Sequence, residues 1–314
     1  LSDRLGLEAG IRVNRVEMDT ELVSANLNPM NMMMGMPAMM NSMAGMLSTA
    51  FNNSGTDQTD TNVDAFARLS YETDGDATWY VGAARKTRSP SYQERYLWSP
   101  LEATGGMADG KTYIGDPSLA PEVAHEIEFG LDYENARYGI YPRAFYKRVS
   151  DYIQGTPSSN MTANNFAQMM ANMGMGRPDP LQFSNVSARF YGFDVDSYFT
   201  LNDQFTLRAI VNVVRADRRD INDDPYRIAP DNLLVALDYQ GNGWTGTIES
   251  VTYADQDRIA VTNLELPTDG YSLINISART EIASGIELSL GAENLLDESY
   301  LDHLAAYNRA FNPD

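Results

Sequence analysis

The sequence has no cysteine, only two histidines and no long hydrophobic run. The missing cysteines exclude disulfides, thiolate nucleophiles, zinc fingers and iron–sulfur clusters. The two histidines, His125 and His303, are too few for a histidine-based metal site or a catalytic triad. No apolar stretch reaches the roughly 18 residues of a membrane-spanning helix, and the mean hydropathy is −0.37.

Positive charge is also scarce. The 23 Lys and Arg residues face 43 Asp and Glu residues, which gives a net charge of −20 and excludes a general nucleic-acid binder. Residues 1–18 show no basic segment followed by an apolar one, so we expect the sequence to begin inside a mature protein or to be a fragment. No nucleophile–base arrangement and no glycine-rich phosphate loop is visible, so we do not expect an enzyme.

Alternation with a period of two dominates the chain. In one segment Ile127, Phe129 and Leu131 alternate with Glu126 and Glu128. This period predicts β-strands, and no stretch shows a convincing helical stripe. The sequence therefore predicts an all-β chain with eleven strands, at roughly 4–18, 62–73, 77–87, 122–134, 137–153, 184–200, 204–217, 230–240, 243–254, 269–280 and 284–293.

The connections between these strands alternate in length. Short ones lie at 73–76, 135–136, 201–203, 240–242 and 281–283, and long ones at 19–61, 88–121, 154–183, 218–229 and 255–268. Tight turns at one end and long loops at the other are typical of a transmembrane β-barrel. A soluble sandwich would mix loop lengths at both ends.

One face of each predicted strand is apolar and the other is charged. In a large membrane barrel the apolar face meets lipid and the charged face lines a wet lumen. We expect Arg88, Arg95, Arg143 and Arg148 to line the lumen or the loop bases and to pair with carboxylates. Eleven strands cannot close a bacterial single-chain barrel, because its strand number is even, so we expect at least one more strand after residue 314.

Methionine is concentrated in two of the long loops. Fourteen of the 16 methionines lie there: Met30, Met32, Met33, Met34, Met36, Met39, Met40, Met43 and Met46 in the first, and Met161, Met169, Met170, Met173 and Met175 in the second. The thioether is a soft, neutral ligand that favours Cu(I) or Ag(I) over Zn(II) and hard ions. The methionines are therefore candidate ligands for copper carried as cargo, with Cu(I) favoured.

The alternative for these windows is an apolar loop that packs on itself, or an adaptable surface that contacts a protein. Nine methionines within 17 residues, interleaved with Gly35, Pro37, Asn41 and Gly45, are poor material for a packed core. Exposed thioethers would also be open to oxidation. Metal handling is the favoured interpretation.

Other polar residues carry weaker functional hypotheses. His125 lies on an apolar face near the outer end of its strand, where an interface residue is expected, and His303 is expected to be structural. The acidic runs 220–224 and 255–257 are candidates for structural Ca(II), although such runs are more often solvated loop tips.

Three segments, in order along the chain, resemble a known family. They are WYVGAARKTRSPSYQERY at 79–96, GDPSLAPE at 115–122 and GAENLLDESY at 291–300 with His303 after it. They are similar to motifs of the TonB-dependent outer-membrane receptors. Within that family, the two methionine windows resemble those of the copper receptors.

The resemblance implies the C-terminal portion of a 22-stranded barrel, with residues 1–314 supplying strands 11 to 21. It places the loops at 19–61 and 154–183 outside a bacterial cell and the short turns in the periplasm. The implied partners are outer-membrane lipid, lipopolysaccharide, and a TonB complex acting through a plug domain that this sequence lacks. The remaining strands would come from the same chain or a companion chain.

Two alternatives to a copper receptor stay open. The first is a receptor of the same family whose cargo is a siderophore or another organic ligand. The second is a barrel that transports nothing and uses its methionine-rich loops to dock a protein partner.

Overall fold

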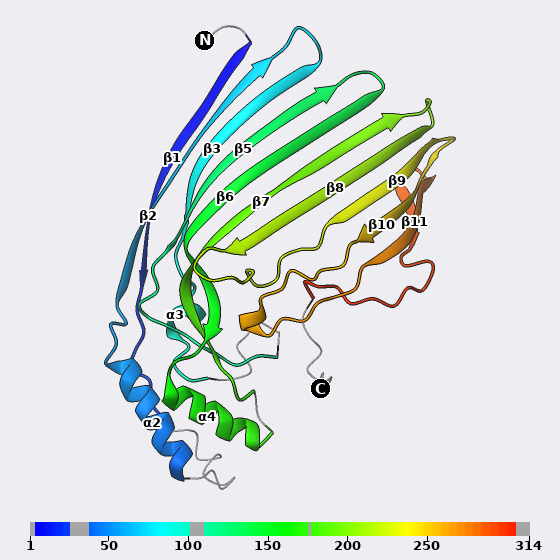
Figure 1. Ribbon diagram of the computed structural model, residues 1–314. Coiled ribbons are helices and arrows are strands. Elements are labelled where there is room, and N and C mark those ends of the chain that lie inside the picture. Colours follow the sequence, from blue (N-terminus) through cyan, green and yellow to red (C-terminus); the bar gives the residue numbers. More distant parts are fainter. Residues whose placement is uncertain (1–3, 26–37, 101–109, 175–176, 306–314) are drawn as a thin grey trace.

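The computed structural model describes residues 4–25, 38–100, 110–174 and 177–305. Eleven strands follow one another in a single antiparallel sheet, in the order in which they occur along the chain (Figure 1). They are β1 (Leu5–Met18), β2 (Gln58–Glu72), β3 (Ala77–Arg88), β5 (Glu122–Glu134), β6 (Tyr138–Pro157), β7 (Leu181–Thr200), β8 (Phe205–Arg218), β9 (Asn232–Gly241), β10 (Trp244–Tyr253), β11 (Tyr271–Ala283) and β12 (Ile286–Ala292). A two-residue strand, β4 (Tyr113–Ile114), pairs in parallel with β7.

The strand prediction is confirmed, because each of the eleven expected strands is present in an uninterrupted meander. The short connections are tight turns. In the turn between β9 and β10, Asn242 and Gly243 have φ of 52° and 82°. Two successive positive φ values form the hairpin turn that suits the right-handed twist of paired strands. Within the described chain β1 pairs only with β2 and β12 only with β11, so the sheet is an open part of a barrel.

The expectation that no segment is helical was wrong. In the described parts of the long connections lie three α-helices, α2 (Ala38–Asn52), α3 (Tyr92–Tyr96) and α4 (Met161–Asn172), and a 3₁₀ turn at Val261–Asn263. Figure 1 shows α2 and α4 side by side at the end of the sheet opposite the tight turns. None of the helices in the described ranges is both long enough and apolar enough to cross a membrane.

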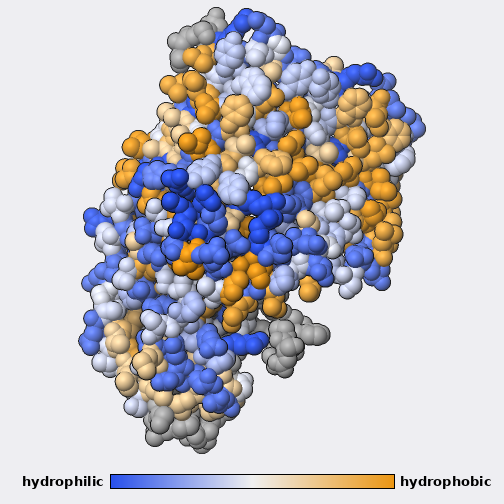
Figure 2. All heavy atoms as spheres, in the orientation of Figure 1, coloured by the Kyte–Doolittle hydropathy of each residue, from blue (hydrophilic) through white to orange (hydrophobic). Residues whose placement is uncertain are grey.

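The two faces of the sheet differ as the alternation predicts. Ile127 and Phe129 of β5 are 59% and 50% exposed on one face, and Trp79 of β3 stacks on Phe129 there, with ring centroids 5.5 Å apart. On the other face Arg12 of β1 pairs with Asp64 of β2 at 2.6 Å. Figure 2 shows hydrophobic side chains gathered at the right-hand edge of the molecule, over β9 to β11. So much exposed apolar surface on strands fits a sheet whose outer face is in lipid.

Candidate metal-capture site

Helix α2 forms because the first methionine window ends in a sequence that favours a helix. Methionine, alanine and leucine are among the strongest helix formers, and they make up most of 38–47. The buried residues Met40, Ala44, Leu47 and Phe51 recur at helical spacing and form one apolar stripe. This stripe is the signal that the sequence prediction missed, because the glycines and asparagines between the methionines were interpreted as a loop.

Helix α4 carries a similar stripe and a defined start. The side chain of Asn160 accepts a hydrogen bond from the backbone N–H of Ala163 at 3.1 Å, which caps the first turn. Ala163, Phe166 and Ala167 are buried on the face that follows. The cap and the stripe together fix which side of α4 meets the rest of the protein.

The two helices pack on each other in one hydrophobic cluster. Its buried members share an apolar character and come from three separate segments: Met40, Ala44 and Leu47 of α2, Ile114 of β4, and Ala163 and Phe166 of α4. Met43 of α2 and Met169 and Met170 of α4 are half-buried against it. The structure thus brings together side chains from methionine windows that lie more than 100 residues apart in the sequence.

The window methionines occupy different environments. Met40 is fully buried, whereas Met46, Met161 and Met173 are 56%, 76% and 41% exposed. The remaining residues of the two windows are not all placed: Met30, Met32, Met33, Met34, Met36 and Met175 lie outside the described residues, and of Met39 only the backbone is described. Met40 has the burial of a packing residue, and the exposed thioethers are accessible to a soluble metal ion.

Ion pairs stabilise the start of the connection between β3 and β5. Arg88 at the end of β3 forms ion pairs with Glu94 at 2.9 Å and with Glu122 at 2.7 Å. Glu94 also accepts a hydrogen bond from the backbone N–H of Ser91, which completes a capping box at the start of α3. Burial acts against the charged form of Glu94, yet these hydrogen bonds hold its pKa below the usual value.

A second ion pair at the loop base is fully buried. Arg95 of α3 lies 2.8 Å from Asp60 of β2 and also donates to the carbonyl oxygen of Leu119 at 3.0 Å. The expectation that Arg88 and Arg95 pair with carboxylates at the loop base is confirmed. Through Arg95, the segment at 79–96 therefore contacts both β2, at Asp60, and the chain just before β5, at Leu119.

The structure gives no support to a calcium site. Asp220 pairs with Arg218, whose hydrogen bond lowers the pKa of the Asp220 carboxyl, and Asp223 accepts hydrogen bonds from the backbone N–H groups of Val261 and Thr262. The parts of the chain that the structure describes hold no group of three or more His, Asp or Glu side chains placed to bind a metal ion.

The buried pair of His303 and Glu265 is one that the sequence did not predict. Nε2 of His303 lies 3.2 Å from Oε1 of Glu265, a close approach without the geometry of a hydrogen bond, and Nδ1 lies 3.1 Å from the hydroxyl of Thr268. Glu265 also accepts hydrogen bonds from the backbone N–H groups of Arg227 and Ala260. These contacts give His303 the structural surroundings expected for it.

The comparisons with known proteins agree with this architecture. Residues 1–295 match the family described as TonB dependent receptor-like, beta-barrel. The chain belongs to this family. TonB-dependent receptors are transporters of the bacterial outer membrane, so the apolar face of this sheet is the face that meets lipid. No curated protein matches the sequence.

Several solved structures of TonB-dependent receptors share the fold. The copper transporter OprC is 19% identical, with a TM-score of 0.72 over 97% of this chain and 41% of that chain. The siderophore receptor PirA from Pseudomonas aeruginosa is 16% identical, with a TM-score of 0.56 over 77% of this chain and 41% of that one. The FrpB iron transporter from Neisseria meningitidis is 12% identical, with a TM-score of 0.57 over 98% and 50%. The chain therefore spans half or less of the length of these receptors.

Two of the residues singled out in the sequence face lipid in this receptor family's arrangement. His125 lies on the apolar face of β5, three residues after the strand begins, where an interface residue was expected. Arg148 of β6 is directly opposite His125, so it is also on the apolar face, and its expected place in the lumen was wrong. Arg143 faces the lumen, opposite Gly130 of β5 and Asp194 of β7.

Proposed function

We propose that this chain is the C-terminal portion of a TonB-dependent receptor that imports copper across the bacterial outer membrane. Its long loops would face the outside of the cell and its short turns the periplasm. The methionine windows would bind Cu(I) and release it toward a plug domain that engages the TonB complex. The observation that carries the proposal is the packing of α2 on α4, which joins the two windows.

Ligand chemistry favours a soft monovalent metal. Thioether sulfur needs no deprotonation and binds Cu(I) and Ag(I) in preference to hard ions. Met43, Met169 and Met170 are half-buried at the border of the α2–α4 cluster, and Met46, Met161 and Met173 are exposed on the same two helices or their ends. Such a set offers sulfur both at the surface and next to an apolar interior.

The likeness to OprC adds support from the fold. It covers nearly the whole described chain and has a higher TM-score than the likeness to PirA or FrpB.

The second candidate cargo is a siderophore or another organic ligand. PirA is a siderophore receptor, and the lumen face of this chain holds a polar hollow of about 390 Å³. Tyr141, Arg143, Asp194, Asp196 and Asn212 line that hollow. A large polar ligand would use these side chains rather than the methionines.

The test is a variant of the complete receptor in which every window methionine except Met40 is replaced by leucine. Leucine is close to methionine in volume and in helix propensity, so the helices should still fold and pack. We expect Ag(I) affinity, measured by titration calorimetry on the purified receptor, to fall at least tenfold, and copper uptake by cells to fall with it. The matched control is Met40→Leu, which removes a sulfur that is buried and should leave both values unchanged.

Three results would overturn the copper proposal. The first is unchanged Ag(I) affinity in the multiple variant. The second is metal uptake that requires an organic chelator, which would favour the siderophore alternative. The third is a protein partner that buries both windows while no metal is bound, which would favour the docking alternative.

A further inference from the structure

The segment that follows β12 lies against two of the long connections. In the connection between β10 and β11, His303 meets Glu265, with Nε2 3.2 Å from Oε1, and Thr268, with Nδ1 3.1 Å from the hydroxyl. In the connection between β8 and β9, the guanidinium of Arg227 donates to the carbonyl oxygen of Ala305 at 3.5 Å. Figure 1 shows the segment, in red, at the end of the sheet that holds the loops. His303 is therefore a point at which three parts of the chain are joined.

Glu265 is the acidic partner in this contact, and its carboxylate is buried. The side chains of Glu265 and His303 are both 1% exposed. The carboxylate accepts hydrogen bonds from the backbone N–H groups of Arg227 at 2.9 Å and Ala260 at 2.7 Å. In the described ranges no lysine or arginine side chain forms an ion pair with it, and His303 is its basic neighbour. A buried charge is costly unless it is paired, so the stability of this contact depends on the charge of His303.

The geometry of the pair distinguishes the two protonation states of His303. Within the described chain Nε2 is buried and has no hydrogen-bond partner. A hydrogen bond from a neutral imidazole needs an alignment that is absent here, whereas the attraction between two charges depends mainly on their distance. The imidazolium therefore binds the carboxylate of Glu265 at the observed distance, and the neutral ring gains much less. Imidazole changes its charge between roughly pH 5 and 8.

The backbone next to Glu265 is strained. Leu264 has φ of 53° and ψ of 40°, a left-handed conformation that is unfavourable for a residue with a branched side chain. Its side chain is 67% exposed, so packing of that side chain does not hold the conformation. The neighbours on either side do: Asn263 accepts a hydrogen bond from Gln154 of β6 at 2.9 Å, and Glu265 makes the contacts described above. Loss of the contact to His303 would allow Leu264 to relax and this loop to move.

Other charged groups near the pair act in the same direction as His303. Burial raises the pKa of the Asp224 carboxyl, and repulsion from Asp223 and Glu265 adds to this shift, while Arg258 opposes it. A carboxyl whose pKa is raised by folding binds its proton more tightly in the folded state, so it stabilises the fold as the pH falls. An experiment on His303 must therefore separate its effect from that of Asp224.

We propose that His303 and Glu265 form a pH-sensitive latch on the loops of this receptor. When His303 is protonated, the ion pair holds the segment after β12 on the loop at 255–268. When His303 loses its proton, the pair loosens, Leu264 relaxes and the segment and the loop move apart. The proposal rests on the proposed orientation, which places these loops outside the cell and exposes the latch to the external pH. It is independent of the cargo.

The test measures the distance between the two latched parts in the complete receptor. The sequence has no cysteine, so spin labels can be attached at Val261→Cys and Leu301→Cys alone, where the native side chains are 66% and 76% exposed. Double electron–electron resonance in lipid vesicles, at about pH 5.5 and about pH 8, gives the distance distribution on either side of the imidazole titration. The variants are His303→Gln and Glu265→Gln, and the matched control is His125→Gln, which removes the other histidine of the chain.

We expect the labelled receptor and the His125→Gln control to show one short distance at the lower pH. At the higher pH the population at longer distances should be at least threefold larger. His303→Gln and Glu265→Gln should each show the same distribution at both pH values.

A labelled receptor whose distances do not change with pH would overturn the latch, whether or not the variants fold. So would a His303→Gln variant that keeps the full response. If that response disappeared in Asp224→Asn instead, the carboxyl of Asp224 would be the switch and the assignment to His303 would be wrong. Ag(I) affinity should be unchanged in His303→Gln, so the outcome is separate from the copper test.

Discussion

In the long loops, the residue type alone does not predict what Met40 and Arg95 do in the structure. Met40 belongs to a methionine window but is fully buried between α2 and α4, where it acts as a packing residue. Arg95 is charged but only 1% exposed, and it is tolerated there because Asp60 and the carbonyl oxygen of Leu119 accept its hydrogen bonds. At both positions the environment, more than the residue type, determines what the side chain does.

The burial of Met40 leads to a prediction about the stability of the helix pair. Met40→Ala should destabilise the packing of α2 on α4 by about 2–5 kcal/mol, because it leaves a cavity in the cluster. Met40→Leu keeps the volume and should cost less than about 1.5 kcal/mol. Hydrogen exchange of the amides in α2 and α4 measures both effects, and equal exchange in the two variants would show that Met40 does not hold the helices together.

At the scale of elements, the formation of α4 determines where the methionines of the second window lie. Its cap at Asn160 and its apolar stripe place Met169 and Met170 against the hydrophobic cluster that α4 shares with α2. Helix α2 is fixed at its other end by Asn52, which exchanges two hydrogen bonds with the backbone of Val23 at 2.8 and 2.9 Å. Each helix is short, so tertiary packing supplies most of its stability.

Removal of the cap should therefore loosen the site. Asn160→Ala should destabilise α4 by about 0.5–2 kcal/mol, because one backbone N–H of the first turn loses its partner. Amide exchange in α4 should become faster, and Ag(I) affinity of the complete receptor should fall by a smaller factor than in the multiple leucine variant. Gln168→Ala, on the exposed face of the same helix, is the control, and we expect it to change neither value.

Elements also differ in how well the sequence predicts them. The strands were predictable because each half-buried strand repeats the same two-residue alternation. The helical stripe of Met40, Ala44, Leu47 and Phe51 was present in the sequence too, but the glycine and polar residues between its members concealed it. The pairing of α2 with α4 was not predictable, because it depends on how far the chain travels through β2 to β6 before it returns to the same end of the sheet.

On the scale of the whole molecule, the sheet separates lipid on its outer face from water on its inner face. Its outer face carries exposed apolar side chains such as Phe129, and its inner face carries charges and interstrand ion pairs such as the one between Arg208 and Asp238. A chain with a net charge of −20 can still form this sheet, because only every second strand residue needs to be apolar.

This separation predicts that an introduced charge is tolerated at one position of β5 and not at the next. Phe129→Arg places a charge on the lipid face and should destabilise the barrel by about 2–4 kcal/mol if the position is near the bilayer midplane. Glu128→Arg places the same charge on the lumen face, where water is accessible, and should cost clearly less. The fraction of complete receptor that folds into lipid vesicles measures both, and equal loss in the two variants would contradict the assignment of the faces.

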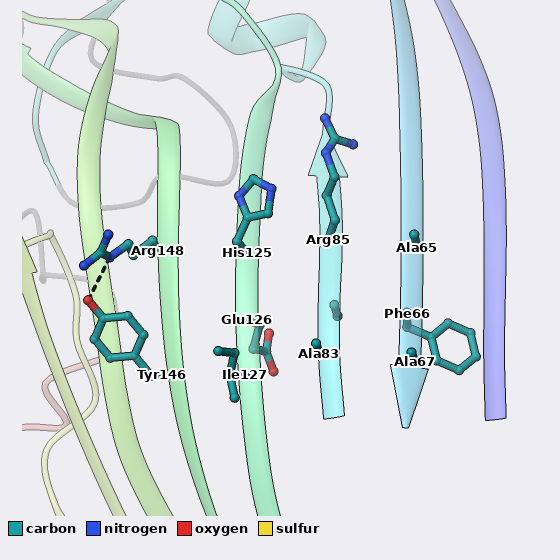
Figure 3. Close-up of a pocket in the computed structure, with 11 residues that line it drawn as sticks. Ala65, Phe66, Ala67, Ala83, Arg85, His125, Glu126, Ile127, Tyr146 and Arg148 are labelled. Atoms are coloured by element: carbon teal, nitrogen blue, oxygen red, sulfur yellow. Dashed lines mark hydrogen bonds between the residues drawn. The ribbon is translucent and has the colours of Figure 1, made fainter. Parts of the chain in front are cut away.

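The sequence by itself determined which residues share a face, where the strands lie and which end holds the long loops, because a period of two and the turn residues are local properties of the chain. Only the tertiary structure decided that Met43, Met169 and Met170 pack against the same buried cluster, and that Arg85, His125 and Arg148 lie opposite one another on neighbouring strands (Figure 3). These groupings depend on strand register and on the return of distant segments to the same place. A shift of two residues would leave every side chain on its own face but would move Arg148 away from His125, and no local pattern in the sequence excludes that shift.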